Sequence, residues 1–589
     1  MYTNLQTYQI VIALLKQYGI KHCVLSAGSR NVPFVHSVEE DPYFTCYSVV
    51  DERSAAYFAI GLSQQLHEPV VISCTASTAS SNYWPGVGEA FYQGVPLVVL
   101  TSDRNPSMLH QWEDQMIDQV GMFDRHVKKS VNLPIINDHD DWLFCQRLVN
   151  EALLELNHHT TGPVHINVPM KDYCNLFEYN KLPVVTKIER INAFSQKSEW
   201  ISKVTKLLNS KRILVICGQN SYVPDSLNQA LTTFFKRYNA TIAVEHMSNI
   251  KCEGMLHTSI CMDERLIPLN KFEDYVPDIV ISLGYNVFQG IKELLRKCHR
   301  PFEHWSIQPD GSVVDMYLNL HVIFECPTTY FFEYCNRVAK EKDTKNDLEY
   351  YQQLKHYVDS ITIPNFEYSN VFAIQRVVEN IPNGSILHLS INNSIRLTNY
   401  FHIQPDVKVY ANIGTYGIDG CLSTFEGQAA ATNHLCFLII GDLSFFYDMN
   451  ALRIRHIKNN ARILMINNQG GGEFYYNGTW NNEASDLHTT ARHHTKAEGW
   501  VKENNFVYLS AHDKETFEKA YTTFMNESEK PIFFEVFTEM KKDADIAHKF
   551  LDMNRPKSLR NELIKKGKEI VKATLPNSAL RNLRIILKK

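Results

Sequence analysis

Long apolar runs, paired cysteines and a strong net charge are all missing from this 589-residue sequence. Without a run of about 18 apolar residues, we expect no membrane-spanning helix. The 13 cysteines show neither Cys-x-x-Cys nor paired Cys/His spacing, which favours reduced thiols in a cytoplasmic protein over disulfides or a zinc site. A net charge of −5 gives no general reason to expect nucleic acid as a partner.

The N-terminus lacks the basic residues of a targeting signal. Leu5, Tyr8, Ile12 and Leu15 are spaced as on one face of a helix, and Gly19 is a natural end for that helix. The composition, 44% hydrophobic and 21% charged, is typical of a soluble globular protein. Because a single hydrophobic core stops growing at about 250–300 residues, we expect about three domains.

Buried strands alternate with helical stretches in three successive blocks. The expected strands are 23–26, 70–74, 97–100 and 164–168; then 213–217, 241–244, 279–283 and 321–324; then 386–389, 407–411, 435–440, 463–466 and 532–536. This alternation predicts an α/β fold with doubly wound parallel-sheet domains. The expected divisions are 1–185, 186–355 and 356–550, followed by a tail, 551–589.

The tail differs from the rest of the chain in charge. From residue 555 onward there are eleven Lys or Arg and two Glu, a net of +9, against −14 for the remainder. Leu559, Leu563, Ile564 and Val571 could line one face of a basic helix. Two interpretations stay open: a helix docked on its own chain or on a dimer partner, or contact with an anionic membrane surface or an acidic partner.

The most informative pair of residues is Asp442 and Asn468, which are 26 residues apart. Asp442 stands in Gly441-Asp442-Leu443-Ser444 and Asn468 in Asn467-Asn468-Gln469-Gly470, and each motif follows an apolar strand. Ligands of parallel sheets bind at the carboxyl ends of the strands, where these two side chains would meet. Carboxylate, amide and carbonyl oxygens are ligands that Mg²⁺ prefers, with phosphate oxygens completing its shell. The alternative is a pair of ordinary polar turns.

A second signal lies in the first block, at Glu52. The segment from Ser48 to Asp51 is expected to be a strand that ends in an acid, with a helix starting near Ser54. Glu52 is then either a first-turn acid favoured by the helix dipole or a carboxylic acid with a catalytic task.

Several further motifs resemble those of thiamine-diphosphate (ThDP) enzymes, and most closely the menaquinone-pathway SEPHCHC synthases (2-succinyl-5-enolpyruvyl-6-hydroxy-3-cyclohexene-1-carboxylate synthases). The resemblance covers roughly residues 5–540 and is weakest in the central block. Its segments are 28–30, 51–56, 74–85, 95–104, 115–123, 417–420, 441–445 and 467–472. It implies a pyrimidine-binding domain, a central domain and a diphosphate-binding domain, with ThDP and Mg²⁺ as cofactors.

The resemblance also implies residue roles. Glu52 would activate the cofactor against its aminopyrimidine ring, and Ile418 would be the bulky residue that bends it. Asp442, Asn468 and the Gly470 carbonyl would hold Mg²⁺, with Gly441, Leu443 and Ser444 beside the cofactor. The residues expected at the substrate are Ser29, Arg30, Arg104, Gln115, Asn392, Arg396, Glu473 and Phe474. Active sites would lie between subunits of a homodimer or homotetramer.

The sequence also departs from the family pattern. The family's Asn-Arg-Gly is here Asn412-Ile413-Gly414, so an arginine that binds carboxylates is missing. Glu473 stands where the family has an apolar residue and is expected to repel a dianionic substrate. His493 and His494 are candidate acid/base groups, or ordinary packing residues. We therefore expect an intact cofactor site and a rebuilt substrate site.

The expected function is ThDP- and Mg²⁺-dependent decarboxylation of a 2-oxo acid followed by C–C bond formation with an electrophilic acceptor. In the family the donor is 2-oxoglutarate and the acceptor isochorismate, and the departures suggest a different donor or acceptor. Three alternatives stay open: SEPHCHC synthase activity itself, a simple decarboxylase or acetolactate-type carboligase, and a non-catalytic ThDP-binding scaffold.

Overall fold

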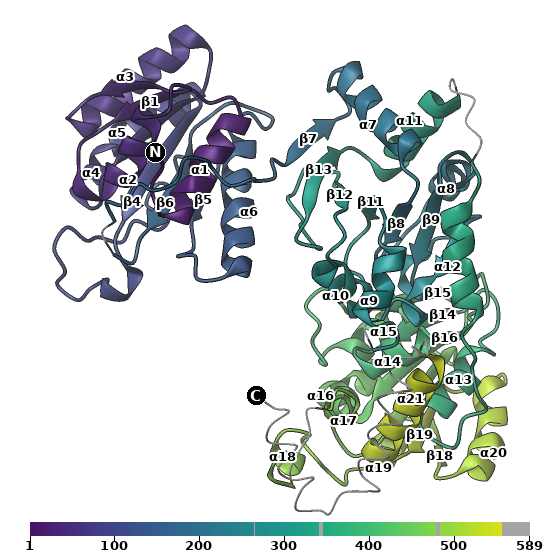
Figure 1. Cartoon of the computed structure of the whole chain (residues 1–589). Helices are drawn as coiled ribbons and strands as arrows, with labels where there is room; N and C mark the ends of the chain where they lie inside the picture. The colour runs from purple at the N-terminus through teal and green to yellow at the C-terminus, as the bar shows by residue number, and fades with distance from the viewer. Residues whose placement is uncertain (173, 264, 341–345, 479–482, 556–589) are drawn as a thin grey trace, which may run out of the picture. The chain divides into compact units, whose positions relative to one another are not determined.

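The computed structural model describes residues 1–172, 174–263, 265–340, 346–478 and 483–555. The chain divides into two compact units (Figure 1). The first comprises Met1–Gln196 and His304–Cys326, and the second Lys197–Glu303 and Pro327–Lys589. Within the described residues, none of the helices has the length and apolar character needed to cross a membrane. Of the expected tail, 551–589, residues 551–554 belong to the helix Met540–Asn554, and residues 556–589 lie outside the described residues.

The first unit contains a parallel sheet with the strand order β2-β1-β3-β4-β6-β5. Its strands are β1 (His22–Leu25), β2 (Thr45–Ser48), β3 (Val70–Cys74), β4 (Leu97–Asp103), β5 (Ser130–Asn132) and β6 (Val164–Pro169). The helices around it are α1 (Gln6–Gln17), α2 (Val32–Glu39), α3 (Glu52–Leu66), α4 (Thr78–Asn82), α5 (Trp84–Gln93) and α6 (His139–Glu155).

Side chains of this sheet alternate between two apolar cores. In β3, Val71 packs into a core with residues of α1 and α6, whereas Val70 and Ile72 pack into a second core with residues of α3 and α5. Successive side chains of a strand point to opposite faces, so a strand buried on both faces reads as a continuous apolar run. This is why β3 starts with three apolar residues in succession, Val70, Val71 and Ile72.

The middle part of the chain contributes strands to both units. The second unit holds β10 (Met255–His257), β9 (Ala240–Val244), β8 (Ile213–Cys217) and β11 (Ile279–Leu283) in that parallel order. The first unit holds β12 (Glu303–Ile307), β13 (Leu320–Glu325) and β7 (Glu189–Asn192), also parallel. The α-helices of this part are α7 (Lys197–Asn209), α8 (Asp225–Arg237), α9 (Leu269–Phe272), α10 (Gln289–Lys297) and α11 (Thr328–Lys340).

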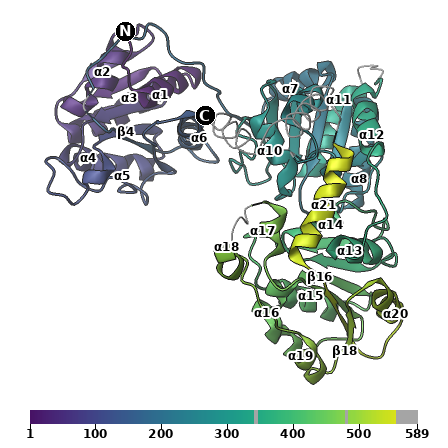
Figure 2. The ribbon, with the colours of Figure 1, turned by 60° about the horizontal axis from the view of Figure 1, so that its bottom comes forward.

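The second unit also contains a parallel sheet with the order β15-β14-β16-β17-β19-β18. Figure 2 labels two of its strands, β16 and β18, and several of its helices. Its strands are β14 (Ile386–Leu389), β15 (Lys408–Ala411), β16 (Cys436–Gly441), β17 (Ala461–Asn467), β18 (Val507–Ala511) and β19 (Ile532–Phe537). The helices are α12 (Glu349–Asp359), α13 (Asn370–Val378), α14 (Asn393–Thr398), α15 (Cys421–Ala430), α16 (Asp442–Asp448), α17 (Gly472–Tyr476), α18 (Glu483–His488), α19 (Glu498–Glu503), α20 (Lys514–Met525) and α21 (Met540–Asn554).

The predicted α/β class with parallel sheets is confirmed, and one local prediction is wrong. The segment from Ser48 to Asp51 was expected to be a strand, but β2 ends at Ser48. The helix begins at Glu52 rather than near Ser54, because the Asp51 side chain caps it by accepting the backbone N–H of Ser54 at 2.9 Å. Glu52 is thus the first residue of α3.

A buried carboxyl group in α15 makes the stability of the protein depend on pH. Glu426 is 1% exposed, and neither of its carboxyl oxygens has a hydrogen-bond partner among the described residues. Burial raises its pKa to about 8. The folded-state pKa of Glu426 lies above its ordinary value. The contribution of the neutral carboxyl group to the free energy of unfolding is therefore fully present below about pH 4.5 and is lost as the pH rises from there through 8.

The Glu426→Gln variant is expected to lack this loss. Between pH 5 and pH 9 the wild type should lose on the order of a few kcal/mol relative to the variant, because only the wild type must bury a charge. Thermal unfolding midpoints measured across this range test the expectation. Parallel curves for the two proteins would contradict it.

Candidate functional site

A cavity of about 110 Å³ lies at the carboxyl ends of β14, β16 and β17. In this sheet β14 lies between β15 and β16. The connections that leave the neighbouring strands β14 and β16 therefore run in opposite directions, which opens a crevice between the ends of these two strands. The lining residues come from five segments of the second unit: Asn370 and Ile374, 390–394, Ile418, 441–444, and Ile466, Asn468 and 470–473.

Asp442 joins the two motifs of the predicted site. It is the first residue of α16 and is 2% exposed. One carboxylate oxygen, Oδ2, accepts the backbone N–H of Gly470 at 3.0 Å, and Oδ1 accepts that of Leu443 at 2.7 Å. The carboxylate is thereby fixed at the cavity wall with oxygen lone pairs to spare.

Asn468 lines the same cavity and is oriented by a residue that the sequence reasoning missed. Its Nδ2 donates to Oδ2 of Asp543, in α21, at 3.5 Å. Asp543 also accepts the Asn370 backbone N–H at 2.9 Å and the Thr538 hydroxyl at 2.6 Å. Because the amide nitrogen faces Asp543, the amide oxygen of Asn468 is left for another partner. No local motif marks Asp543, which is 75 residues away in sequence.

Two glycines shape the turn that follows Asn468. Gly470 has φ +151°, and a Cβ there would lie 2.7 Å from the Thr490 carbonyl oxygen. At Gly472 a Cβ would lie 2.6 Å from Nδ2 of Asn468. Since any larger residue would displace the donor atoms of the cavity, the Gly470-Gly471-Gly472 run is a steric requirement of the site.

Ile418, the predicted bending residue, is tied to the start of α16. Its backbone carbonyl accepts the hydroxyl of Ser444, and Ser390 donates to Oγ of Ser444 at 3.0 Å. This chain of hydrogen bonds links the loop after β15 to the ends of β14 and β16. The structure brings Ile418, Gly441, Leu443, Ser444 and Asn392 together around one cavity.

Arg396 and Glu473 form a buried ion pair, which corrects the expectation that Glu473 would repel an anionic substrate. Nη1 and Nη2 of Arg396 lie 2.6 and 2.8 Å from the two carboxylate oxygens of Glu473, and Arg396 is 2% exposed. Although burial favours the neutral carboxyl, the hydrogen bond from Arg396 outweighs it, and the pKa of Glu473 lies below its usual value. Of the described residues, Glu473 lines the cavity but Arg396 and Phe474 do not.

Breaking this pair is expected to be costly. Glu473→Leu leaves the Arg396 guanidinium buried and unpaired, which typically destabilises a protein by roughly 3–5 kcal/mol. The double variant Arg396→Met with Glu473→Leu should recover most of that loss, and the exposed-site control Glu503→Leu should have little effect. Urea unfolding of the four proteins measures this, and equal stability of Glu473→Leu and wild type would contradict it.

His493 lies against the carboxylate of Asp442. Its Nε2 is 3.3 Å from Oδ2 of Asp442, although the angle is outside hydrogen-bond geometry. Its Nδ1 accepts the backbone N–H of Thr495 at 3.1 Å, so in the neutral ring the proton is on Nε2 and faces Asp442. His494 is exposed and its Nδ1 is 3.2 Å from Oε1 of Gln469.

The remaining predicted residues follow strand ends of the first unit. Ser29 and Arg30 follow β1, Glu52 follows β2, and Arg104 follows β4 directly. Glu52 is half-buried, and Arg104 is paired with Glu113. These residues all belong to the carboxyl edge of one parallel sheet, where ligands of such sheets bind.

Gln115 and Gln119 differ in how the fold uses them. Gln115 is exposed and has a positive φ of 51°. Gln119, which the sequence reasoning did not single out, is 1% exposed. It accepts the Ser77 backbone N–H at 2.7 Å and donates to the Ser102 carbonyl at 3.1 Å. Gln119 thus ties the loop that follows β3 to the last residues of β4.

The donor set of the cavity in the second unit fits a hard divalent cation. Mg²⁺ takes oxygen ligands of the types present here: a buried carboxylate, an amide oxygen turned away from Asp543, and a backbone carbonyl in a glycine turn. The residues present therefore suit a diphosphate bound through a metal ion.

Comparisons with known proteins agree with this chemistry. The family model "Thiamine pyrophosphate enzyme, N-terminal TPP binding domain" matches residues 5–122. The 2-succinyl-5-enolpyruvyl-6-hydroxy-3-cyclohexene-1-carboxylate synthase of Bacteroides thetaiotaomicron is 37% identical over 93% of this chain and 98% of its own length. The proteins of the same name from Phocaeicola vulgatus and Flavobacterium psychrophilum are 36% and 32% identical, over 93% and 92% of this chain and 98% and 97% of their own lengths.

Fold, site and comparisons together define a thiamine-diphosphate-dependent enzyme of the class that couples decarboxylation to C–C bond formation. Within that class, the chain belongs to the 2-succinyl-5-enolpyruvyl-6-hydroxy-3-cyclohexene-1-carboxylate synthase family. The family predicted from the sequence motifs is thereby confirmed.

Proposed function

We propose that the chain decarboxylates a 2-oxo acid and joins the remaining fragment to an electrophilic acceptor, with ThDP and Mg²⁺ as cofactors. The observation that carries the proposal is the cavity at which the Asp442 carboxylate, the Asn468 amide and the glycine turn at Gly470 meet. When bound, the thiazolium ring of ThDP supplies an electron sink for the carbanion that decarboxylation leaves.

The residues of this chain would divide the work as follows. Asp442, Asn468 and the Gly470 carbonyl would hold Mg²⁺, and Asp543 would keep the Asn468 amide oxygen turned toward it. Glu52 would donate a hydrogen bond to the aminopyrimidine and so promote proton removal at the thiazolium ring. Apolar groups of the cavity, such as Ile418 and Leu443, would exclude water from the reacting atoms.

The relatives' own reaction provides the first candidate for the substrates. They are named for the synthesis of a 2-succinyl cyclohexene carboxylate, and this chain spans 98% of the length of the Bacteroides thetaiotaomicron protein. Under this candidate, the donor is 2-oxoglutarate and the acceptor isochorismate, as the family resemblance implies. Arginines after the strand ends of the first unit, Arg30 and Arg104, would then bind substrate carboxylates.

A second candidate, a less anionic donor or acceptor, is favoured by the Arg396–Glu473 pair. Glu473 already satisfies the guanidinium of Arg396 with a bidentate contact, so a substrate carboxylate would have to displace it. The isoleucine at position 413, where the family has an arginine, removes another charged partner for a substrate carboxylate. Such a loss typically lowers the binding free energy by about 1.5–3 kcal/mol per hydrogen bond to a charge.

Product analysis distinguishes the two candidates. The enzyme with ThDP and Mg²⁺ is given 2-oxoglutarate, pyruvate or another 2-oxo acid, each with and without isochorismate, and CO₂ and adducts are quantified. Turnover of 2-oxoglutarate that rises with isochorismate supports the first candidate. Preference for another 2-oxo acid, or indifference to isochorismate, supports the second, and CO₂ release from pyruvate alone would indicate a simple decarboxylase or acetolactate-type enzyme.

The proposal includes the organisation of the protein. Domains 1–185 and 356–550 would bind the pyrimidine and diphosphate ends of ThDP, with the central domain, 186–355, between them in sequence. The family resemblance implies a cytoplasmic homodimer or homotetramer in which different subunits contribute these two domains. Light scattering on the purified protein would give the number of subunits, and a monomer that turns over substrate would contradict this part of the proposal.

A further inference from the structure

Two consecutive histidines and a glutamate from a distant strand meet in the first unit. His158 and His159 follow α6, and Glu325 is the last residue of β13. Nε2 of His158 lies 3.2 Å from Oε2 of Glu325, and Nε2 of His159 lies 3.4 Å from Oε1 of the same carboxylate. One ligand atom from each of the three residues lies within 4.8 Å of the others.

The backbone at His159 adopts a conformation that non-glycine residues rarely take. Its φ is +59°, in the left-handed region. This turn brings the two imidazole rings to a centroid distance of 3.9 Å, nearly stacked, and directs both toward Glu325 even though the His159 side chain is 70% exposed. Residues held in such conformations often occur at ligand-binding sites, where the strain positions side chains.

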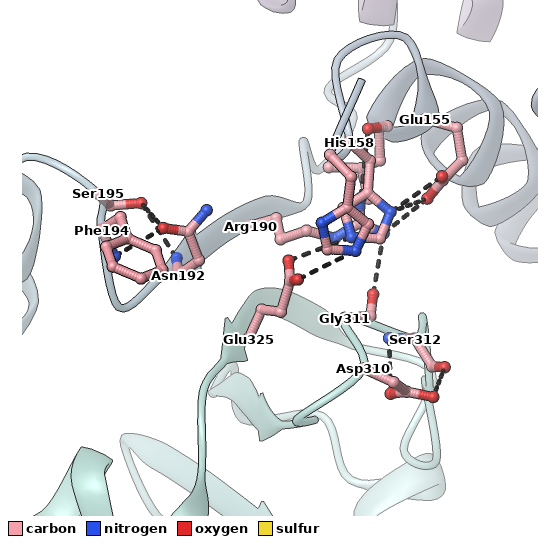
Figure 3. A network of polar contacts seen from close by, with 12 residues as sticks. Glu155, His158, Arg190, Asn192, Phe194, Ser195, Asp310, Gly311, Ser312 and Glu325 are labelled. Carbon is pink, nitrogen blue, oxygen red and sulfur yellow. Dashed lines mark hydrogen bonds and ion pairs between the residues drawn. The ribbon is translucent and has the colours of Figure 1, made fainter. Parts of the chain in front are cut away.

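A second carboxylate orients His158 from behind (Figure 3). Both oxygens of Glu155 lie within 3.1 Å of Nδ1 of His158, while Arg190 donates to Glu155 at 2.9 Å and to the Gly311 carbonyl at 2.9 Å. Because Nδ1 faces the Glu155 carboxylate, it carries a proton there, and a metal ion bound at Nε2 would take the place of the proton that Nε2 directs to Glu325. A histidine whose second nitrogen donates to a carboxylate is the usual arrangement behind a metal ligand.

The space around the cluster is kept open by a glycine. Gly311 has φ +71°, and a Cβ there would lie 3.0 Å both from Oε2 of Glu325 and from Nε2 of His158. In the same unit, Leu154 of α6 packs against Ile188, Leu320 and Ile323. The helix that precedes His158 and the strand that ends in Glu325 therefore also share an apolar contact.

We propose that His158, His159 and Glu325 bind a divalent transition-metal ion of the Zn²⁺ type. Ligand atoms at about 2.0–2.1 Å from one tetrahedral ion lie about 3.4 Å apart. The Nε2 atoms of His158 and His159 lie 3.2 and 3.4 Å from the two different oxygens of Glu325, and one ligand atom from each residue lies within 4.8 Å of the others, so small side-chain shifts would bring the three onto one ion. Two imidazoles and a carboxylate suit Zn²⁺, whereas the all-oxygen cavity of the second unit suits Mg²⁺. The exposure of His159 leaves a side open for a water molecule as fourth ligand.

The bound ion would act as a clip between segments that are 167 residues apart, from His158 to Glu325. It would neutralise the Glu325 carboxylate and hold the end of α6 on β13. Because Glu155 is already balanced by Arg190, the three ligands with neutral imidazoles carry a net charge of about −1, which favours a cation.

The test is calorimetric titration of Zn²⁺ into the metal-stripped full-length protein in excess Mg²⁺ and ThDP. His159→Gln removes an exposed ligand without disturbing the core, Glu325→Gln removes the shared carboxylate, and His434→Gln is a control at an exposed histidine elsewhere. The wild type and the control should bind one more Zn²⁺ per chain than His159→Gln and Glu325→Gln. Sites at thiols or in the Mg²⁺ cavity are common to all four proteins and cancel in this comparison.

Two further readouts accompany the titration. Zn²⁺ should raise the unfolding temperature of the wild type and of His434→Gln more than that of His159→Gln. Co²⁺ should give visible d–d absorption in the same two proteins and lose it in His159→Gln. Equal Zn²⁺ binding by wild type and His159→Gln, or no Zn²⁺ binding by either, would overturn the proposal and leave an ion-paired cluster without a metal.

Discussion

Replacing Glu52 by glutamine is expected to lower kcat by about 10²–10⁴, the usual contribution of a positioned acid or base, while ThDP still binds. Glu52 is the first residue of α3, and Asp51 rather than Glu52 caps that helix, so the substitution should leave the fold unchanged. The loss should therefore appear in kcat and not in the thermal unfolding midpoint. Steady-state rates, thermal unfolding and calorimetric ThDP binding measure kcat, the unfolding midpoint and the cofactor affinity.

A matched control for Glu52 is available in another helix. Glu349 is also an acid in the first turn of a helix, α12, and is exposed. Glu349→Gln should keep wild-type rates, because a first-turn acid contributes to helix stability and not to the reaction. A wild-type kcat in Glu52→Gln would show that Glu52 does not activate the cofactor.

The second large effect is expected at Asp442. Asp442→Asn keeps an oxygen that can accept the Gly470 and Leu443 backbone N–H groups but removes the charge that a divalent cation needs. Mg²⁺-dependent ThDP affinity should fall by more than the 10–100-fold that typically follows loss of a residue behind a metal ligand. The exposed Asp545→Asn on α21 should retain full affinity. Unchanged cofactor affinity in Asp442→Asn would show that the metal lies elsewhere.

The site residues that directly follow a strand could be predicted from the sequence. Asp442 and Asn468 each follow a strand that is apolar on both faces, and the parallel order places the ends of β16 and β17 side by side. The strand before Glu52 is predicted to extend too far because Val49 and Val50 prolong the apolar run beyond β2. The strand ends at Ser48, and the helix capped by Asp51 begins at Glu52.

The parts that depend on side chains distant in sequence could not be predicted. Asp543 orients Asn468 from 75 residues away, and Glu473 pairs with Arg396 across 77 residues. The sequence indicated a glutamate facing the substrate but not the guanidinium that neutralises it. The grouping of His158 and His159 with Glu325 could not be predicted either, because Glu325 is 167 residues from His158 and no local spacing links them.

The most direct test of the central claim is CO₂ release from 2-oxo acids by the purified full-length protein, with ThDP and Mg²⁺ and then after EDTA treatment. The account predicts release that requires both cofactors and is accompanied by a C–C-linked adduct when an acceptor is supplied. Binding of ThDP without CO₂ release from any 2-oxo acid, with or without an acceptor, would contradict it and indicate a scaffold that retains the cofactor but not the reaction.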